Sequence, residues 1–345
     1  LEGPAGKITY DGTVDAYPLS VAAKGSGRVD ALDLSKLIAA RERVPDGFLT
    51  GTYQLDIRGD TNDLGTLTGA ASALVERSEL DGIRIFPSRV RARFADGRMH
   101  VDTLRIESTA ARVDASGTIG LTRSVADSLR YVVSVDSLGG LRRYVQTLIP
   151  TTATTAAGDS ISGMISLAGV ARGTLKALDL TGRITGTDLF IRREAGREIT
   201  GSYALTNIQG GANGNFAVNV HDLNVGGIRL DTLGVDVRFD RRPGTNGGGV
   251  FTLGALAANG VRLDAAGDIA TSADSALALT LRSAALVTDS SRWTLRGVAP
   301  IRQTTLEFAL DSLVLANGRG GRVSLEARVA RAGNTGETPR RLYRP

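Results

Sequence analysis

Apolar and polar residues alternate along most of this chain, and this period of two constrains its fold more than any other feature. Val113, Ala115 and Ile119 share one parity, whereas Arg112 and Asp114 share the other. The same alternation recurs in the segments TYQLDIRG, RVRARF, LGVDVRFD, VRLDAAGDIA, LALTLRSA and VSLEARVA. Successive side chains of a β-strand point to opposite faces, whereas helical spacing would scatter these apolar residues around an axis. Each run is therefore predicted to be a strand with one apolar and one polar face.

Short clusters rich in glycine, asparagine and aspartate separate the alternating runs. They are ADGR (95–98), GGANGN (210–215), RRPGTNGGG (241–249) and ANGRGGR (316–322). The chain contains 43 glycines but only 9 prolines, which favours tight turns between strands. Strands joined by short turns form antiparallel meanders, because parallel strands need a longer crossover, commonly a helix. The sequence therefore predicts an all-β fold, a long antiparallel β-meander repeat.

Two segments depart from the alternation. LDLSKLIAARERVP (32–45) and DSLGGLRRYVQTLIP (136–150) space their apolar residues as in a helix and end at a proline, so we expect two short helices there. The predicted organisation is a β-repeat segment that ends in the second helix (1–150), a small polar linker (151–160), a second β-repeat segment that continues the same sheet (161–332) and a disordered tail (333–345).

Parts of the sequence repeat one another. HVDTLRIESTAARVDASGTIGL (100–121) matches GVFTLGALAANGVRLDAAGDIA (249–270) in pattern, and LTGTYQLDIRG (49–59) matches ISGMISLAGVA (161–171). We expect the first copy to form a hairpin with a strand through 104–106, a turn near 108–111 and a second strand over 113–121. Repeated units that cannot bury a face alone indicate a stacked architecture.

Composition excludes several functions. The formal net charge is +5, but acids are interleaved with the basic residues, so the basic stripe of a nucleic-acid-binding protein is missing. The chain has no cysteine, which excludes disulfides and thiolate metal sites. No apolar run reaches about 18 residues and no signal peptide is visible. Because the chain begins at Leu1, we expect it to be a piece of a longer protein.

The only histidines are His100 and His221, each beside an aspartate, Asp102 and Asp222. A His–Asp pair is conceivable from this spacing, but exposed strand residues at a repeated position explain it more simply. No catalytic or metal-binding motif is present. We therefore expect no enzyme activity, no cofactor and no bound metal.

The cadence of the repeats resembles the TamB-like translocation and assembly module proteins of the AsmA-like superfamily. The segments that carry the resemblance are LTGTYQLDIRG (49–59), LGTLTGAASAL (64–74), MHVDTLRIESTAARVDASGTIGL (99–121), ISGMISLAGV (161–170), VHDLNVGGIRLD (220–231) and VRLDAAGDIA (261–270). The resemblance covers most of residues 48–330, and it is one of cadence, without an invariant motif.

The resemblance implies a fold and a function. Such proteins carry a long antiparallel sheet curled into an open apolar groove in the periplasm of diderm bacteria. The groove is thought to carry phospholipid acyl chains between the inner and outer membranes. The resemblance further implies attachment to the inner membrane through a segment outside this chain, a role in outer-membrane biogenesis and protein secretion, and an outer-membrane barrel of the Omp85 type as a partner.

One apolar set of side chains is predicted to line this groove. Its members are Leu55, Ile57, Leu104, Ile106, Val113, Ala115, Ile119, Val218, Val220, Val235, Val237, Phe239, Val261, Leu263, Ala265, Ile269, Leu279, Val323 and Leu325. From pattern alone, a closed β-sandwich in which the same faces pack on each other is favoured over an open groove. The family resemblance reverses that order.

Two other interpretations remain open from the sequence. One is a structural or adhesive secreted β-solenoid or β-sandwich with a closed core, although solenoids of secreted passenger domains usually show a tighter repeat than this chain. The other is a platform for protein assembly, in which an edge strand pairs with a client protein. The platform is compatible with lipid carriage.

Overall fold

The computed structural model describes residues 2–330 of the 345-residue chain, with interruptions. The residues left out within that range are 4, 18–19, 34–35, 37–46, 61, 81, 123–126, 137, 140–160, 192–193, 209–212, 226, 241–246, 272–276 and 304–306. The described chain is all-β, and its strands pair as an antiparallel meander. It divides into two compact units.

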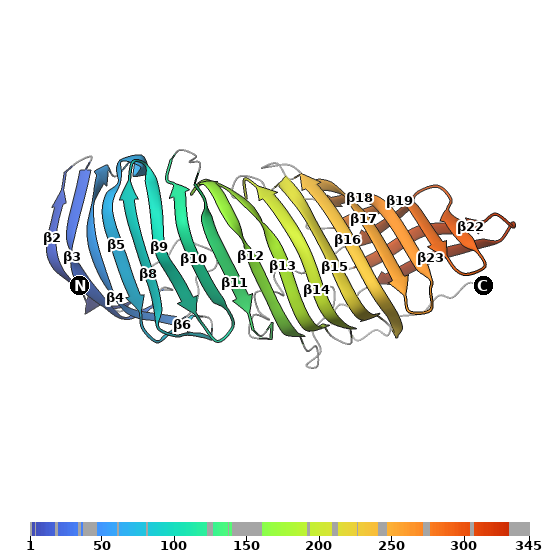
Figure 1. Ribbon diagram of the computed structural model, residues 1–345, viewed down its shortest axis with the longest axis horizontal. Coiled ribbons are helices and arrows are strands. Elements are labelled where there is room, and N and C mark those ends of the chain that lie inside the picture. Colours follow the sequence, from blue (N-terminus) through green and yellow to red (C-terminus); the bar gives the residue numbers. More distant parts are fainter. Residues whose placement is uncertain are drawn as a thin grey trace. The chain divides into compact units, whose positions relative to one another are not determined.

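Unit 1 comprises Leu1–Leu141, Met164–Arg183 and Thr206–Gln209. Its strands are β1 (Glu2–Gly3), β2 (Gly6–Ala16), β3 (Ser20–Asp33), β4 (Gly47–Asp60), β5 (Thr68–Val75), β6 (Ser78–Leu80), β7 (Ile83–Ile85), β8 (Ser88–Ala95), β9 (Arg98–Glu107), β10 (Arg112–Gly120) and β11 (Leu129–Val135), with parts of β12 (Ile161–Thr174) and β13 (Ala177–Ile191). Successive long strands pair antiparallel, and β5 pairs directly with β8 because the short strands β6 and β7 lie beside the end of β4. Figure 1 shows β2 to β11 in blue to green.

Unit 2 comprises Arg142–Gly163, Ile184–Leu205 and Gly210–Pro345. Most of β14 (Glu194–Thr206) belongs to it, followed by β15 (Asn213–Val225), β16 (Ile228–Asp240), β17 (Gly248–Ala257), β18 (Arg262–Thr271), β19 (Leu277–Val287), β20 (Arg292–Leu295), β21 (Ala299–Gln303), β22 (Glu307–Asn317) and β23 (Arg322–Ala330). From β15 to β19 each strand pairs antiparallel with the next. The short strands β20 and β21 both pair with β19 and with β22, so together they replace one long strand.

The register gives the sheet of unit 1 two chemically different faces. Residues directly opposite each other in an antiparallel pair lie on the same face. Leu104 is opposite Val90 on β8 and Ala115 on β10, whereas Arg105 is opposite Asp114. We call the side that carries Leu104 and the residues in register with it the apolar face of unit 1, and the side that carries Arg105 the polar face.

Unit 2 is divided in the same way. Val235 is opposite Val218 on β15 and Leu253 on β17, whereas Asp236 is opposite Thr252. We call the side that carries Val235 the apolar face of unit 2, and the side that carries Asp236 its polar face. Period-two alternation in the sequence is the direct cause, because a strand turns each successive side chain to the other side.

Most of the predicted local structure is confirmed. The alternating runs form β4, β8, β10, β16, β18, β19 and β23. The hairpin predicted around residues 104–121 is β9 and β10, joined by a turn at 108–111 where the Ser108 N–H donates to the Ala111 carbonyl at 2.9 Å. The turn predicted at 95–98 has Asp96 and Gly97 in the left-handed region, with φ of 51° and 69°, as a two-residue hairpin turn requires.

Several predicted elements lie outside the described residues. They are nearly all of the two helices at 32–45 and 136–150, the whole linker 151–160 and the tail 333–345. At the start of the first helix segment, Leu32 is still part of β3. The 3-10 turn η1 (Leu64–Thr66), capped by the Asp63 carboxylate, was not predicted, because its Leu-Gly-Thr sequence lies within a run that alternates like a strand.

Gly117 illustrates why the strands of this chain contain glycine. Gly117 on β10 has a φ of 125°, and a Cβ built there would lie 2.3 Å from the carbonyl oxygen of Ser128. It follows a register shift between Ala115 and Gly117 in the pairing with β9. Such a bulge bends the strand and increases its twist, and only glycine avoids both the clash and the backbone strain.

Candidate functional site

The apolar face of unit 1 is built from one parity of each strand between β2 and β12. In its central row, Tyr53 on β4 is opposite Gly27 and Ala73. The row continues through Val90 to Leu104. Seven predicted residues lie on this face, and they are Leu55, Ile57, Leu104, Ile106, Val113, Ala115 and Ile119. The register therefore brings together side chains from β4, β9 and β10.

Further apolar side chains share this face but were missing from the predicted set. They include Val90, Phe94, Met99, Val101 and Tyr131. The signal that could have found them is the parity of the run RVRARF and of its partner strand. Whether a given position belongs to the face depends on the register between strands, which the sequence of one strand does not contain.

Burial on this face is graded. Ile119 is 2% exposed, Ala115 9% and Val101 7%, so these positions are part of a packed core. Leu104 and Ile106, in the neighbouring rows, keep intermediate exposure. The exposure of apolar surface to water is unfavourable. An apolar sheet face that is only partly buried is therefore typical of interaction sites.

The apolar face of unit 2 collects most of the other predicted residues. Those placed on it by register are Val218, Val220, Val235, Val237, Phe239, Leu263, Ala265, Ile269, Leu279, Val323 and Leu325. Most keep intermediate exposure, whereas Val323 and Leu325 on β23 are 51% and 50% exposed. Val261 does not belong to a strand and lies in the turn before β18, where its carbonyl accepts a hydrogen bond from the Ala257 N–H.

Aromatic side chains cover the backbone where the apolar face of unit 1 has no Cβ. The rings of Tyr10 and Tyr53 stack with centroids 6.5 Å apart. The Tyr53 hydroxyl donates to the Thr9 carbonyl at 3.0 Å, so its ring lies across Gly27, where a Cβ would meet the hydroxyl at 2.4 Å. Large rings therefore occupy the space that glycines leave on this face.

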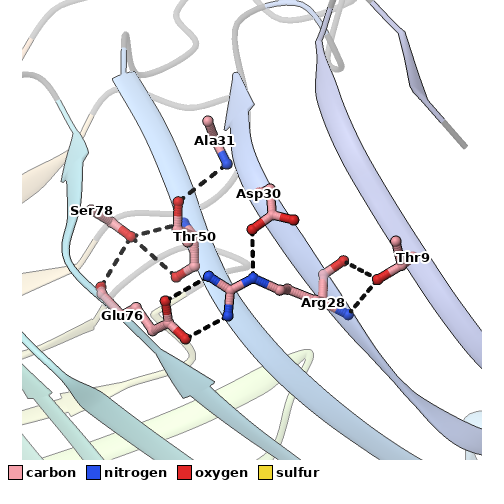
Figure 2. A network of polar contacts seen from close by, with 7 residues as sticks. All are labelled: Thr9, Arg28, Asp30, Ala31, Thr50, Glu76 and Ser78. Atoms are coloured by element: carbon pink, nitrogen blue, oxygen red, sulfur yellow. Dashed lines mark hydrogen bonds and ion pairs between the residues drawn. The ribbon is translucent and has the colours of Figure 1, made fainter.

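The polar face of unit 1 is held by cross-strand ion pairs. Arg28 on β3 donates to both oxygens of Glu76 at 2.8 Å and to Asp30, and Figure 2 shows this network beside the hydroxyls of Thr50 and Ser78. Hydrogen bonding from Arg28 lowers the pKa of Glu76, and the pKa of Arg28 is raised by the same partner and by Asp30. Ser78 is 3% exposed, and its hydroxyl accepts from the Thr50 N–H at 2.9 Å. These contacts fix the end of β4 against β6.

The His–Asp pair that the sequence suggested forms on the polar face. His100 Nε2 lies 3.3 Å from Asp102 Oδ1, and its Nδ1 lies 2.8 Å from the Thr118 hydroxyl. The same carboxylate accepts three hydrogen bonds from Arg93, which lower the pKa of Asp102. In unit 2, Asp222 is instead bound by Arg229 and lies 3.7 Å from Arg197. Both aspartates therefore serve as partners for arginines.

Among the described residues, no group of three or more histidine, cysteine or acidic side chains is arranged to hold a metal ion. Within the same part of the chain, no helix has the length and apolar character needed to cross a membrane.

Comparisons of this chain with protein-family models, with curated proteins and with solved structures find no match. The resemblance of its repeats to TamB-like proteins therefore stays a prediction.

Proposed function

We propose that this chain is a phospholipid-carrying segment of a bacterial envelope protein, in which the apolar face lines an open groove that binds acyl chains. The observation that carries the proposal is the apolar face in each unit, where strand after strand contributes valine, leucine, isoleucine or alanine at the same register. The proposed role is carriage without chemical change to the lipid.

Physical chemistry supports this use of such a face. Each CH₂ group removed from water contributes about 0.8 kcal/mol, so a continuous apolar wall binds an acyl chain without any specific polar contact. Aromatic residues make up only 5% of the chain, which leaves few bulky side chains to interrupt the wall. Ala265, a small residue of intermediate exposure, alternates with Leu263 on the apolar face of unit 2 and leaves room for a chain.

Two observations weigh against the other interpretations. A parallel β-solenoid requires parallel pairing, but the strand pairings given above are antiparallel, and the described chain adds only a single parallel pair, Gly120 with Thr174. In a closed β-sandwich the facing side chains are removed from solvent. Leu104, Ile106 and Val113 instead keep intermediate exposure on the apolar face.

The proposal extends to location and partners. We place this segment in the periplasm of a diderm bacterium, where a carrier of phospholipid between two membranes is needed. An outer-membrane barrel of the Omp85 type is the proposed receiving partner, as in the family that the sequence resembles.

Photocrosslinking in cells tests the proposal. A benzophenone amino acid replaces Ile106 or Val113 in unit 1, and Val237 or Leu263 in unit 2. Matched controls replace Arg112 in unit 1 and Asp236 in unit 2, which are exposed on the polar faces of the same units. We expect phospholipid adducts, identified by mass spectrometry, from the apolar-face positions at several times the yield of the controls. Equal yields from both faces would reject lipid carriage.

A further inference from the structure

A shallow depression of about 550 Å³ lies on the sheet of unit 1. It crosses β2, β3, β4, β5 and β8. Three adjacent rows of cross-strand neighbours line it, and the middle row has its side chains on the apolar face: Tyr10, Gly27, Tyr53, Ala73 and Val90. Ser26, Gln54 and Ser72 lie in the row that ends at Arg91. Thr52 and Leu74 lie in the row that ends at Arg89. These two outer rows point to the polar face, so on that face the depression lies between two rows of mostly polar side chains, over the backbone of the middle row.

The two ends of this depression differ in charge. At the β3 end, Arg28 is bound by Asp30 and Glu76, so its charge is more than balanced. At the β8 end, Arg89 and Arg91 are exposed, and neither forms a direct ion pair with a carboxylate among the described residues, whereas Asp102, which Arg93 binds, interacts with Arg91 at longer range. An anion that enters the depression is therefore repelled at the β3 end and attracted at the β8 end.

The lack of a direct ion-pair partner at Arg89 and Arg91 contrasts with their neighbours on the same face. Arg93 binds Asp102, and Arg105 binds Asp114 at 2.7 Å. Arg89 is moreover directly opposite Arg105 in the β8–β9 register. Asp114 balances the charge of Arg105 in this pair, so Arg89 is the arginine of the two whose charge has no direct ion-pair partner.

We propose that the β8 end of this depression binds a phosphate-bearing anion, held by the guanidinium groups of Arg89 and Arg91. The two residues are separated by one position on the same strand, so their Cα atoms are about 7 Å apart and both side chains point to the polar face. Guanidinium groups bind phosphate oxygens through paired N–H donors. The hydroxyl of Ser72, directly opposite Arg91 on β5, supplies a further donor.

This site is independent of lipid carriage on the apolar face. A sheet separates the two faces, so one lipid molecule does not reach both through it. The anion is a phosphate group, and its source is either a free phosphate compound or the headgroup of an anionic phospholipid. The test separates these sources, and its result does not depend on whether the apolar face binds acyl chains.

The test uses the full chain and two probes, inorganic phosphate and vesicles of phosphatidylglycerol in phosphatidylcholine. Binding of phosphate is followed by amide chemical shifts of β5 and β8, and binding of vesicles by co-flotation, with pure phosphatidylcholine vesicles as a blank. We expect saturable binding of at least one probe that weakens as ionic strength rises. Shifts with inorganic phosphate identify free phosphate compounds as sufficient, and flotation alone identifies the headgroup.

Matched variants decide whether the two arginines hold the anion. Arg89→Gln with Arg91→Gln is expected to weaken binding at least about tenfold, because it removes both charge-assisted donors. Arg98→Gln with Arg112→Gln removes the same charge from ion-paired arginines on the same face that are not opposite Arg89 or Arg91, and is expected to change affinity less than about twofold. Arg91→Lys keeps the charge without the paired donors, and an intermediate loss is expected in a variant whose fold is unchanged. Equal losses in the two double variants, or no saturable binding of either probe, would overturn the site.

Discussion

Two hairpins with similar sequences have different surroundings in this molecule. The first hairpin is β9 and β10 in unit 1, and the second is β17 and β18 in unit 2. Ile119 in the first corresponds to Ile269 in the second, and Gly117 corresponds to Gly267. Ile119 is only 2% exposed, whereas Ile269 keeps intermediate exposure. The same sequence pattern therefore places an isoleucine on the apolar face in both units, but its burial depends on the neighbours.

The turns of the two hairpins also differ in burial, because the first is packed and the second is exposed. In the first, the Ser108 hydroxyl accepts from the Ala111 N–H at 3.0 Å and donates to the Ala111 carbonyl, and the neighbouring Thr109 N–H donates to Arg84. In the second, Asn259 accepts from the Val261 N–H at 3.2 Å in an exposed turn. The first turn is packed against β7, and Ala110 within it is 2% exposed. Sequence similarity alone thus does not equalise the stability of the two hairpins.

The largest expected effect is a difference in lost stability between alanine variants of the corresponding isoleucines, Ile119 and Ile269. Ile119→Ala leaves a cavity in a packed position and is expected to cost about 3 kcal/mol, whereas Ile269→Ala is expected to cost about 1–2 kcal/mol because part of its side chain already contacts solvent. Native-state hydrogen exchange of peptides from β10 and β18 reports the local free energy of opening in each unit separately. Equal losses of local opening free energy in the two variants would contradict the expected difference between the hairpins.

A smaller effect is expected at the turns. Ser108→Ala leaves turn amides without their acceptor and is expected to lower the stability of the first hairpin by about 1 kcal/mol, whereas Asn259→Ala is expected to cost the second about half of that because water replaces its acceptor. Ser116→Ala, at an exposed position of β10, is the control and is expected to change little. The measurement is exchange protection of the two turn peptides. A larger loss for Asn259→Ala than for Ser108→Ala would contradict the order.

The smallest expected effect is a pH dependence in the first hairpin. Hydrogen bonding from Arg93 lowers the pKa of Asp102. A lowered carboxyl pKa stabilises the folded state above the unfolded-state pKa, and this contribution is lost as pH falls through the folded-state value. Asp102→Asn is therefore expected to reduce the loss of protection in β9 between pH 7 and pH 3. Arg93→Gln is expected to do the same, and the double variant adds nothing further if the two side chains act as one pair.

Much of the fold was predictable because side-chain direction in a strand has a period of two. Alternation around Val113 and Leu263 was enough to predict β10, β18 and the side on which their apolar residues lie. The turn at Asp96–Gly97 was predictable because its residues tolerate a positive φ. The short strands β6, β7, β20 and β21 were not predicted, because runs of three to five residues carry too little periodicity.

The candidate sites could likewise be predicted only in part. Alternation in the sequence was enough to predict an antiparallel β protein with apolar and polar faces, because side-chain direction in a strand follows from local backbone geometry. The pairing of distant strands settles which apolar residues are packed, that Arg28 binds Glu76 from 48 positions away, and that Arg89 and Arg91 border a depression. These features depend on register between strands, and register is fixed by contacts among residues far apart in the chain.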